Sequence, residues 1–202
     1  MSVDKVILRA FLSTLAAIAV LLVVMFTALV VIYPQTMMEI TYDLGMESSS
    51  IHFAEESYKR THEVYYIAYA TEVAIGEENG GKIVSCGEKL IADKGFESYC
   101  EKKDNSMPDE VTTSYKQYVC GQICVAMYKN GEKEAAVLRA FEMVGEEFPT
   151  NNAVIALLVA ANRDSDTSTV EMIKGKMNIL QEKLPEGSAK EYIGQVLALL
   201  EK

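Results

Sequence analysis

Hydrophobic residues gather first in one long run near the start of the chain. The run from Ala10 to Tyr33 has 24 residues and carries no charge. Its only polar members are Ser13, Thr14 and Thr27. About 20 apolar residues cross a bilayer core of about 30 Å as a helix, and a buried core helix would normally show a polar stripe. The pattern therefore predicts a transmembrane helix over residues 10–33.

A cleaved secretory signal is the main alternative for such a run. The apolar part of a signal usually has about 7–15 residues and ends at a small-x-small cleavage site. This run is longer, and its last residues, from Val30 to Pro34, are poor cleavage residues. We therefore expect an uncleaved anchor, which Pro34 kinks or ends.

Two basic residues before the run, Lys5 and Arg9, indicate its direction across the membrane. No lysine or arginine follows the run until Lys59. Basic residues beside a membrane span remain on the cytoplasmic side. We therefore expect residues 1–9 to form a short cytoplasmic N-terminus and residues 34–202 to lie outside the cell membrane.

The segment after the run, residues 34–202, is long enough for one domain and is acidic. Without Asp4, Lys5 and Arg9, the chain's 19 basic and 29 acidic residues become 17 and 28, a net charge of −11. Phosphate binding requires a basic surface, so we expect no nucleic acid partner. The chain has no Asn-x-Ser/Thr acceptor for N-glycosylation, which fits a bacterial surface.

The same segment has few prolines, many helix-favouring residues and apolar positions at helical spacing. It predicts an all-α fold of antiparallel helix pairs, less regular over 34–103 and repeat-like over 109–202. The main helices are expected at 61–77, 83–91, 109–128, 132–148, 153–161, 170–184 and 188–200. The helix at 153–161 is nearly all apolar but too short to span a membrane, and we expect it to be buried.

Capping and turn residues mark expected helix ends. Gly45 can end a helix in the left-handed conformation, and Ser48–Ser50 offer N-caps for the next helix. A turn is expected at Asn79-Gly80-Gly81, and a loop at Lys102–Pro108. The sequence Ser188-x-x-Glu191 predicts a capping box.

The expected helices alternate with short turns, and two of them end at Pro149 and Pro185, 36 residues apart. Such a period suggests stacked helix pairs. Tyr128 is followed by an Asn130-Gly131 turn and then by small and aromatic residues at Ala136, Ala140, Phe141 and Pro149. With these residues, the segment 128–149 resembles part of a tetratricopeptide repeat.

The resemblance covers about one repeat well. Gly121, Cys124 and Val125 stand where the family prefers a bulky aromatic residue, leucine and glycine, and Lys176 and Met177 replace the alanine and phenylalanine in the next pair. The resemblance implies a protein-interaction scaffold with a concave peptide-binding face, and neither catalysis nor a cofactor. An irregular helical bundle is the alternative.

The four cysteines are Cys86, Cys100, Cys120 and Cys124. Outside the cytoplasm they could form two disulfides. Cys120 and Cys124 lie one turn apart on a predicted helix, too far apart to bond to each other, and could instead pair with Cys86 and Cys100. Four buried free thiols are the alternative. A zinc site is disfavoured because the chain has no Cys-x-x-Cys pair.

Other candidate sites have plain structural explanations. His52 and His62 lack a third metal ligand nearby. The stretch 164–168 imitates the start of a calcium loop, but Thr169 replaces the required glycine and Gly175 the closing glutamate, so we expect helix-capping residues in a solvated turn. No catalytic or phosphate-binding motif is present.

Four early tyrosines are expected to pack in the core, with a binding patch as the alternative. They are Tyr58, Tyr65, Tyr66 and Tyr69. From these patterns we expect a non-catalytic, membrane-anchored helical module that docks a protein or peptide. The alternative is a structural subunit of a membrane or cell-envelope complex, whose anchor itself packs against its partners.

Overall fold

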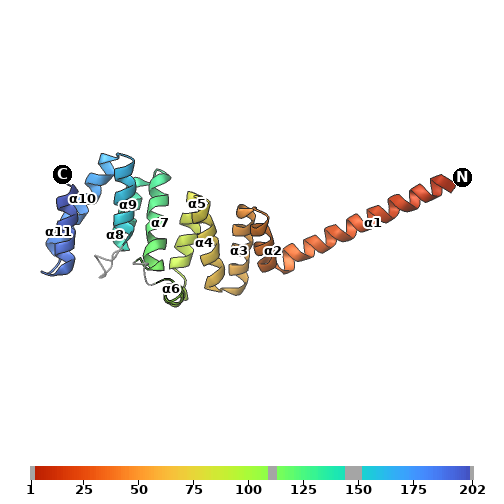
Figure 1. The fold of residues 1–202 in the computed structure, drawn as a ribbon, viewed down its shortest axis with the longest axis horizontal. Coiled ribbons are helices and arrows are strands. Elements are labelled where there is room, and N and C mark those ends of the chain that lie inside the picture. The colour runs from red at the N-terminus through yellow and green to blue at the C-terminus, as the bar shows by residue number, and fades with distance from the viewer. Residues whose placement is uncertain (1–2, 109–112, 144–151, 201–202) are drawn as a thin grey trace. The chain divides into compact units, whose positions relative to one another are not determined.

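The computed structural model describes residues 3–108, 113–143 and 152–200. These residues form eleven helices and no strand, so the all-α prediction is confirmed (Figure 1). The helices are α1 (Val3–Ile32), α2 (Pro34–Asp43), α3 (Glu47–Thr61), α4 (Val64–Gly76), α5 (Gly80–Ile91), α6 (Phe96–Asp104), α7 (Tyr115–Lys129), α8 (Lys133–Glu142), α9 (Asn152–Arg163), α10 (Thr167–Lys183) and α11 (Ser188–Leu200). They fall into two compact units, residues 1–62 and 63–202.

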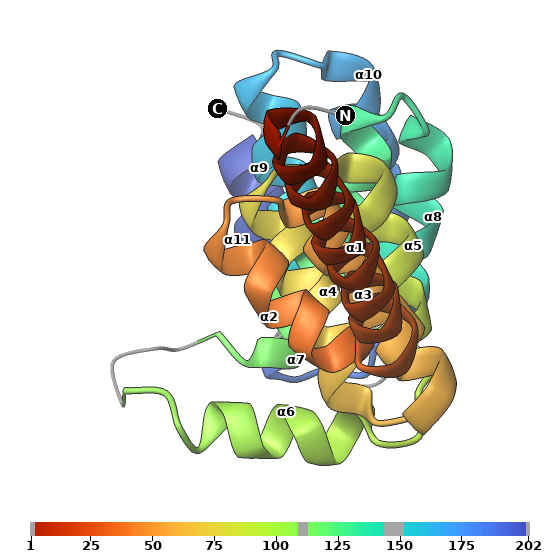
Figure 2. The same ribbon diagram turned by 90° about the vertical axis from the view of Figure 1, so that its right-hand side faces the viewer.

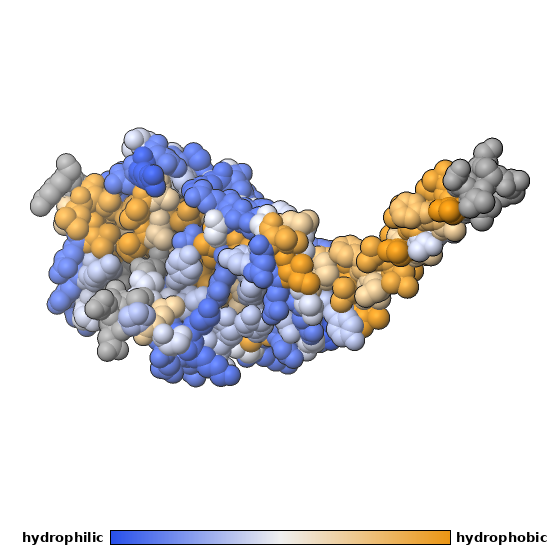
Figure 3. Space-filling model, turned by 45° about the vertical axis from the view of Figure 1, so that its right-hand side comes forward, coloured by the Kyte–Doolittle hydropathy of each residue, from blue (hydrophilic) through white to orange (hydrophobic). Residues whose placement is uncertain are grey.

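Helix α1 is the predicted apolar helix, and its apolar part, Ile7–Ile32, is 26 residues long and entirely unburied. Figure 3 shows hydrophobic residues along its surface. The hydroxyls of Ser13, Thr14 and Thr27 donate to carbonyls of their own helix at 2.8–2.9 Å, as an apolar surrounding requires. The helix ends at Ile32, and Pro34 opens α2, so the proline ends this helix.

Helices α2 and α3 form a hairpin in the first unit. Gly45 adopts the left-handed conformation (φ 67°), as predicted. The predicted caps at Ser48–Ser50 are wrong, because Met46 is the N-cap and the serines lie within α3. The buried Ser50 hydroxyl instead donates to the Met38 carbonyl at 2.9 Å and ties α3 to α2.

One type of turn recurs in both units. The residues at Gly45, Glu78, Gly131 and Ser165, after α2, α4, α7 and α9, all have positive φ. At the third turn, Gly131 N–H bonds to the Tyr128 carbonyl and Glu132 N–H to the Met127 carbonyl. This pair of bonds satisfies the last helix carbonyls. The following residue is already the N-cap of the next helix.

The spacing of these turns is regular except at one place. Gly45 and Glu78 lie 33 residues apart, and Gly131 and Ser165 lie 34 apart. Glu78 and Gly131 lie 53 apart. The additional residues of this interval include α6, which lies outside the paired helices of its unit in Figure 2.

Helix α6 corrects the loop that we expected from Lys102, because the helix continues to Asp104. It is fixed to its neighbours by polar contacts. Lys103 Nζ lies 2.9 Å from a carboxylate oxygen of Glu72 in α4. The Asp104 carboxylate accepts a hydrogen bond of 2.7 Å from the Tyr115 N–H and so caps α7.

Two expected helix starts are also wrong. The helix predicted at 61–77 is present as α4 but begins only at Val64, because α3 ends at Thr61 and His62 is left-handed (φ 55°). The glycines of the predicted turn at Asn79 form the first turn of α5. Asn79 is its N-cap and accepts a hydrogen bond from Lys82 N–H at 3.2 Å.

The predicted capping box at Ser188 is wrong as well, since Glu191 N–H bonds to the Gly187 carbonyl one residue earlier. A complete box occurs instead at Ser114 and Gln117, before α7. The predicted start of this helix at 109–112 lies outside the described residues, and Thr113 precedes the cap.

One hydrophobic cluster of the second unit lies where α7, α8, α9 and α10 meet, and α4, α5 and α7 bury a further set of apolar side chains. Helix α9 buries five residues of its apolar run, Ala153, Val154, Leu157, Leu158 and Ala161, but Val159 on its other face is 61% exposed, so the helix is half-buried rather than buried all round as expected. Helix α10 ends before Pro185, as predicted, and α11 covers the core with Ile193 and its partly buried neighbours. The expected end of α8 at Phe148 lies outside the described residues.

Helices α5 and α7 approach closely at Gly87. A Cβ added to Gly87 would lie 2.6 Å from Cδ1 and 2.7 Å from Cγ1 of Ile123. The Ile123 side chain is fully buried and has little room to move. Glycine is therefore required here by packing.

The substitution Gly87→Ala should lower the free energy of unfolding by about 1–3 kcal/mol, because the added methyl group overpacks the core. Gly175→Ala is the matched control, since a Cβ there meets nothing within 4 Å. The control should raise stability by about 0.5–1 kcal/mol, because alanine favours a helix interior. Thermal unfolding of the full chain in detergent measures both, and equal effects would contradict this packing.

Candidate functional site

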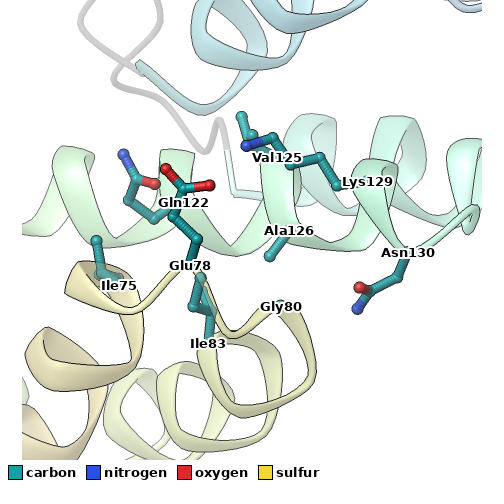
Figure 4. Close-up of a pocket in the computed structure, with 9 residues that line it drawn as sticks. All are labelled: Ile75, Glu78, Gly80, Ile83, Gln122, Val125, Ala126, Lys129 and Asn130. Carbon is teal, nitrogen blue, oxygen red and sulfur yellow. The ribbon is translucent and has the colours of Figure 1, made fainter. Parts of the chain in front are cut away.

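The second unit carries a groove built from the α4–α5 turn, α7 and α9. One hollow of about 180 Å³ lies between the α4–α5 turn and α7 (Figure 4). A second, of about 430 Å³, lies between α7 and α9. The hollows share Glu78, Val125 and Lys129, so we treat them as one groove, the α7 groove.

The α7 groove has an apolar floor and a polar rim. Its apolar residues are Ile75, Ile83, Val125, Ala126, Ala156, Val159 and Ala160. Its polar residues are Glu78, Gln122, Lys129, Asn130, Arg163 and Asp164. In Figure 4, Glu78 and Gln122 extend at one end of the first hollow, and Lys129 and Asn130 lie toward the other.

The rim contains polar groups that the fold itself does not use. Within the described part of the chain, the side chains of Glu78, Lys129 and Arg163 make no hydrogen bond or ion pair. The two cations stand out on a domain that is strongly acidic. Their charges remain available to a ligand that lies in the groove.

Glu78 combines a backbone role with a side-chain position on the rim. Its φ of 51° lies in the left-handed region, which costs a residue with a Cβ roughly 1 kcal/mol or more. Glycine fills the equivalent place at Gly45 and Gly131. The chain thus keeps a carboxylate at the rim despite this backbone cost.

A network beside the groove holds neighbouring turns together. Burial and the neighbouring carboxylates of Asp164 and Asp166 raise the pKa of Tyr128 to about 12. Lys133 Nζ lies 2.6 Å from Asp166, and this contact and the hydrogen bonds from Thr169 lower the pKa of Asp166 to about 2. Asp166 caps α10, so the stretch resembling a calcium loop serves as a helix cap, as expected.

A third hollow, separate from the α7 groove, lies between α8 and α10. It has a volume of about 310 Å³ and is lined mainly by apolar side chains, including the exposed Leu138 and Ile179. Its charged members include Glu171, which pairs with Lys174 on the same helix at 2.9 Å. Fewer polar side chains without a hydrogen bond or ion pair line this hollow than line the α7 groove.

The residues of the tetratricopeptide resemblance line the core rather than the groove. Ala136 and Ala140 are fully buried on α8, Tyr128 is buried at the end of α7, and Phe141 is partly buried. Pro149 lies outside the described residues.

The residues predicted to set orientation, Lys5 and Arg9, both lie in the first turns of α1. The early tyrosines are not core residues, contrary to expectation. Tyr65 is exposed, and Tyr58, Tyr66 and Tyr69 are half-buried. The buried face of α4 is formed instead by Ile67, Ala68, Ala70, Thr71, Val73 and Ala74.

The four cysteines are buried free thiols in the structure. Cys124 Sγ lies 3.9 Å from Met143 Sδ. Burial raises the pKa of Cys100 and of Cys124 to about 12, and it also raises the pKa of Cys120. Thiol labelling can distinguish these free thiols from the alternative of disulfides.

Sequence reasoning missed the α7 groove. Its rim residues lie one turn from apolar ones, as Val125 does from Lys129 and Val159 from Arg163. That spacing on a single helix is typical of an ordinary half-exposed face. Only the pairing of α7 with α9 and with the α4–α5 turn brings these positions together.

Comparison of the chain with models of known families, with curated proteins and with solved structures finds no match.

Thiol labelling should give four adducts in denaturant without reductant, and very slow labelling of the folded full chain at pH 8. A thiol with a pKa of about 12 holds about a thousandth of the thiolate of one with the ordinary value of 9.0. The labelling rate should rise with pH, because deprotonation supplies the nucleophile. Mass spectrometry counts the adducts, and two or four missing adducts that return after reduction would establish disulfides.

Proposed function

We propose that this chain is a membrane-anchored, non-catalytic interaction module whose α7 groove binds a segment of a protein partner. The observation that carries the proposal is the groove itself. It combines an apolar floor with charged side chains of both signs, Glu78, Lys129 and Arg163, that make no hydrogen bond or ion pair within the described residues. An apolar floor with a few placed polar groups is typical of a binding site. The entirely unburied apolar surface of α1 supports the anchor.

We further propose that the second unit is a tetratricopeptide-like stack of helix pairs. Three observations support it. Helix α7 contacts both α8 and α9, and α8 contacts α10, as in successive antiparallel pairs. The turns at Gly131 and Ser165 are 34 residues apart, the period of that family. Small side chains at Ala136 and Ala140 are fully buried, which allows close packing of the pairs.

The charges of the groove favour a ligand of mixed charge. Lys129 and Arg163 can receive carboxylates, and Glu78 a basic side chain or an N–H donor. The amides of Gln122 and Asn130 can bond to a peptide backbone. A short peptide with alternating apolar and charged residues satisfies both floor and rim.

A photo-crosslinking residue at Val159 should capture the partner, because this side chain is 61% exposed at the groove floor. The experiment uses the full chain in its native membranes. Leu199 on α11, also well exposed, is the control position away from the groove. Ile179 tests the hollow between α8 and α10.

The Arg163→Glu substitution should reduce the Val159 crosslink by about fivefold or more, since interface charges of this kind carry a large share of binding energy. Its thermal midpoint should fall only slightly, because the Arg163 side chain makes no hydrogen bond or ion pair within the described residues and the reversed charge acts only on the C-terminal end of α9. Equal crosslinking from Val159 and Leu199, or crosslinking from Ile179 alone, would reject the α7 groove as the site.

For the anchor, we propose that the N-terminus is cytoplasmic and that the domain lies outside the cell membrane. The support is the pair Lys5 and Arg9 before the apolar helix. Replacement of α1 by an unrelated anchor tests the structural-subunit alternative, because only a subunit that packs through α1 would lose its function.

An alkaline phosphatase fused after Lys202 should be active, because that enzyme folds only outside the cytoplasm. The double substitution Lys5→Gln and Arg9→Gln should lower this activity by removing the charge bias. A fluorescent protein fused at the same place should stay dark. Bright fluorescence with an inactive phosphatase would reverse the orientation.

A further inference from the structure

Helix α2 carries an apolar stripe that its hairpin leaves uncovered. Tyr33, Ile40 and Leu44 are 53%, 40% and 68% exposed. Ile40 and Leu44 are four residues apart and share one flank of the helix, and Tyr33 is the non-helical residue directly before it. The side of α2 that packs in its unit is formed by other residues, Pro34, Met37, Met38 and Thr41.

The charges of α2 lie on a different side from this stripe. Glu39 and Asp43 each precede a stripe residue by one position, which is about 100° around the helix. Both are exposed. The stripe itself carries no charge and begins at Tyr33, the residue that joins α1 to α2.

The length of α1 sets the position of the start of the stripe relative to the bilayer. The charge-free part from Ala10 to Ile32 has 23 residues and rises about 35 Å at 1.5 Å per residue. This is close to the bilayer core of about 30 Å. Tyr33 therefore falls at the interface with the headgroups, where tyrosine is favoured.

Two features keep α2 near the headgroup interface. The chain changes direction at Pro34, and α2 runs across the line of α1 (Figure 1). Arg60, near the end of α3, donates from Nη1 to the Val31 carbonyl at 2.5 Å. This bond fastens the α2–α3 hairpin to the last turn of α1 and places a cation at the negative end of the helix dipole.

We propose that α2 lies in the membrane interface, with Tyr33, Ile40 and Leu44 inserted among the lipid headgroups and the first acyl carbons. Amphipathic helices bind in this way through their apolar flank. The proposal rests on the anchor proposed above and adds a second contact, which fixes the tilt of the first unit on the bilayer.

Tryptophan fluorescence tests the contact, because the chain has no native tryptophan. The full chain is reconstituted in phosphatidylcholine nanodiscs at one copy per disc, as the single variants Leu44→Trp, Asp43→Trp and Leu22→Trp. Asp43 is the matched control on the polar side, and Leu22 reports the span. Quenching by brominated lipid and by aqueous acrylamide is measured for each.

Lipid bromine should quench Leu44→Trp about twofold or more above Asp43→Trp, and acrylamide should show the reverse order. Leu22→Trp should be quenched by lipid bromine alone. If Leu22→Trp is quenched by lipid bromine alone but Leu44→Trp is quenched to the same extent as Asp43→Trp, the interfacial contact of α2 is wrong and the transmembrane anchor is still supported. If Leu22→Trp is open to acrylamide, the anchor itself is wrong. A Leu44→Trp shielded from both quenchers would assign the stripe to protein and overturn the proposal.

Discussion

Reversal of the chain about one left-handed residue is the constraint on which both helical units depend. Each such turn satisfies the last carbonyls of one helix and places the N-cap of the next within two residues. Consecutive helices must therefore lie antiparallel and close together. Close helices favour small side chains, and the chain buries Ala136 and Ala140 on α8, which follows the turn at Gly131. The core and the α7 groove both follow from this geometry.

The sequence predicted a turn at or beside all four of these residues, but it pointed to the left-handed residue itself only where that residue is glycine. Gly45 and Gly131 are common left-handed residues, whereas Glu78 and Ser165 adopt the same conformation against their usual preference. The serines at 48–50 resemble N-caps, but the tight turn at Gly45 begins the helix earlier. The apolar run of α9 predicted its core face, but not its other face, where Val159 is exposed and lines the groove.

The candidate groove could not be predicted in the same way. Its floor and rim come from α4–α5, α7 and α9, and each helix alone presents an ordinary half-exposed face. Tyr128 illustrates the same limit, since its position suggested helix packing but not its place beside the carboxylates of Asp164 and Asp166. The longer interval between Glu78 and Gly131 could not be predicted from the repeat spacing of the turns either. It contains α6, which is held in place by individual contacts such as the ion pair of Lys103 with Glu72.

Glu78 links the groove to the turn that positions it, and this has a consequence for how the protein can change. Its backbone would be relaxed by glycine, which lacks the Cβ that opposes a positive φ. On the proposed function, that exchange would remove a rim carboxylate while it stabilises the fold. Selection for a more stable chain and selection for its ligand therefore act in opposite directions on this one residue.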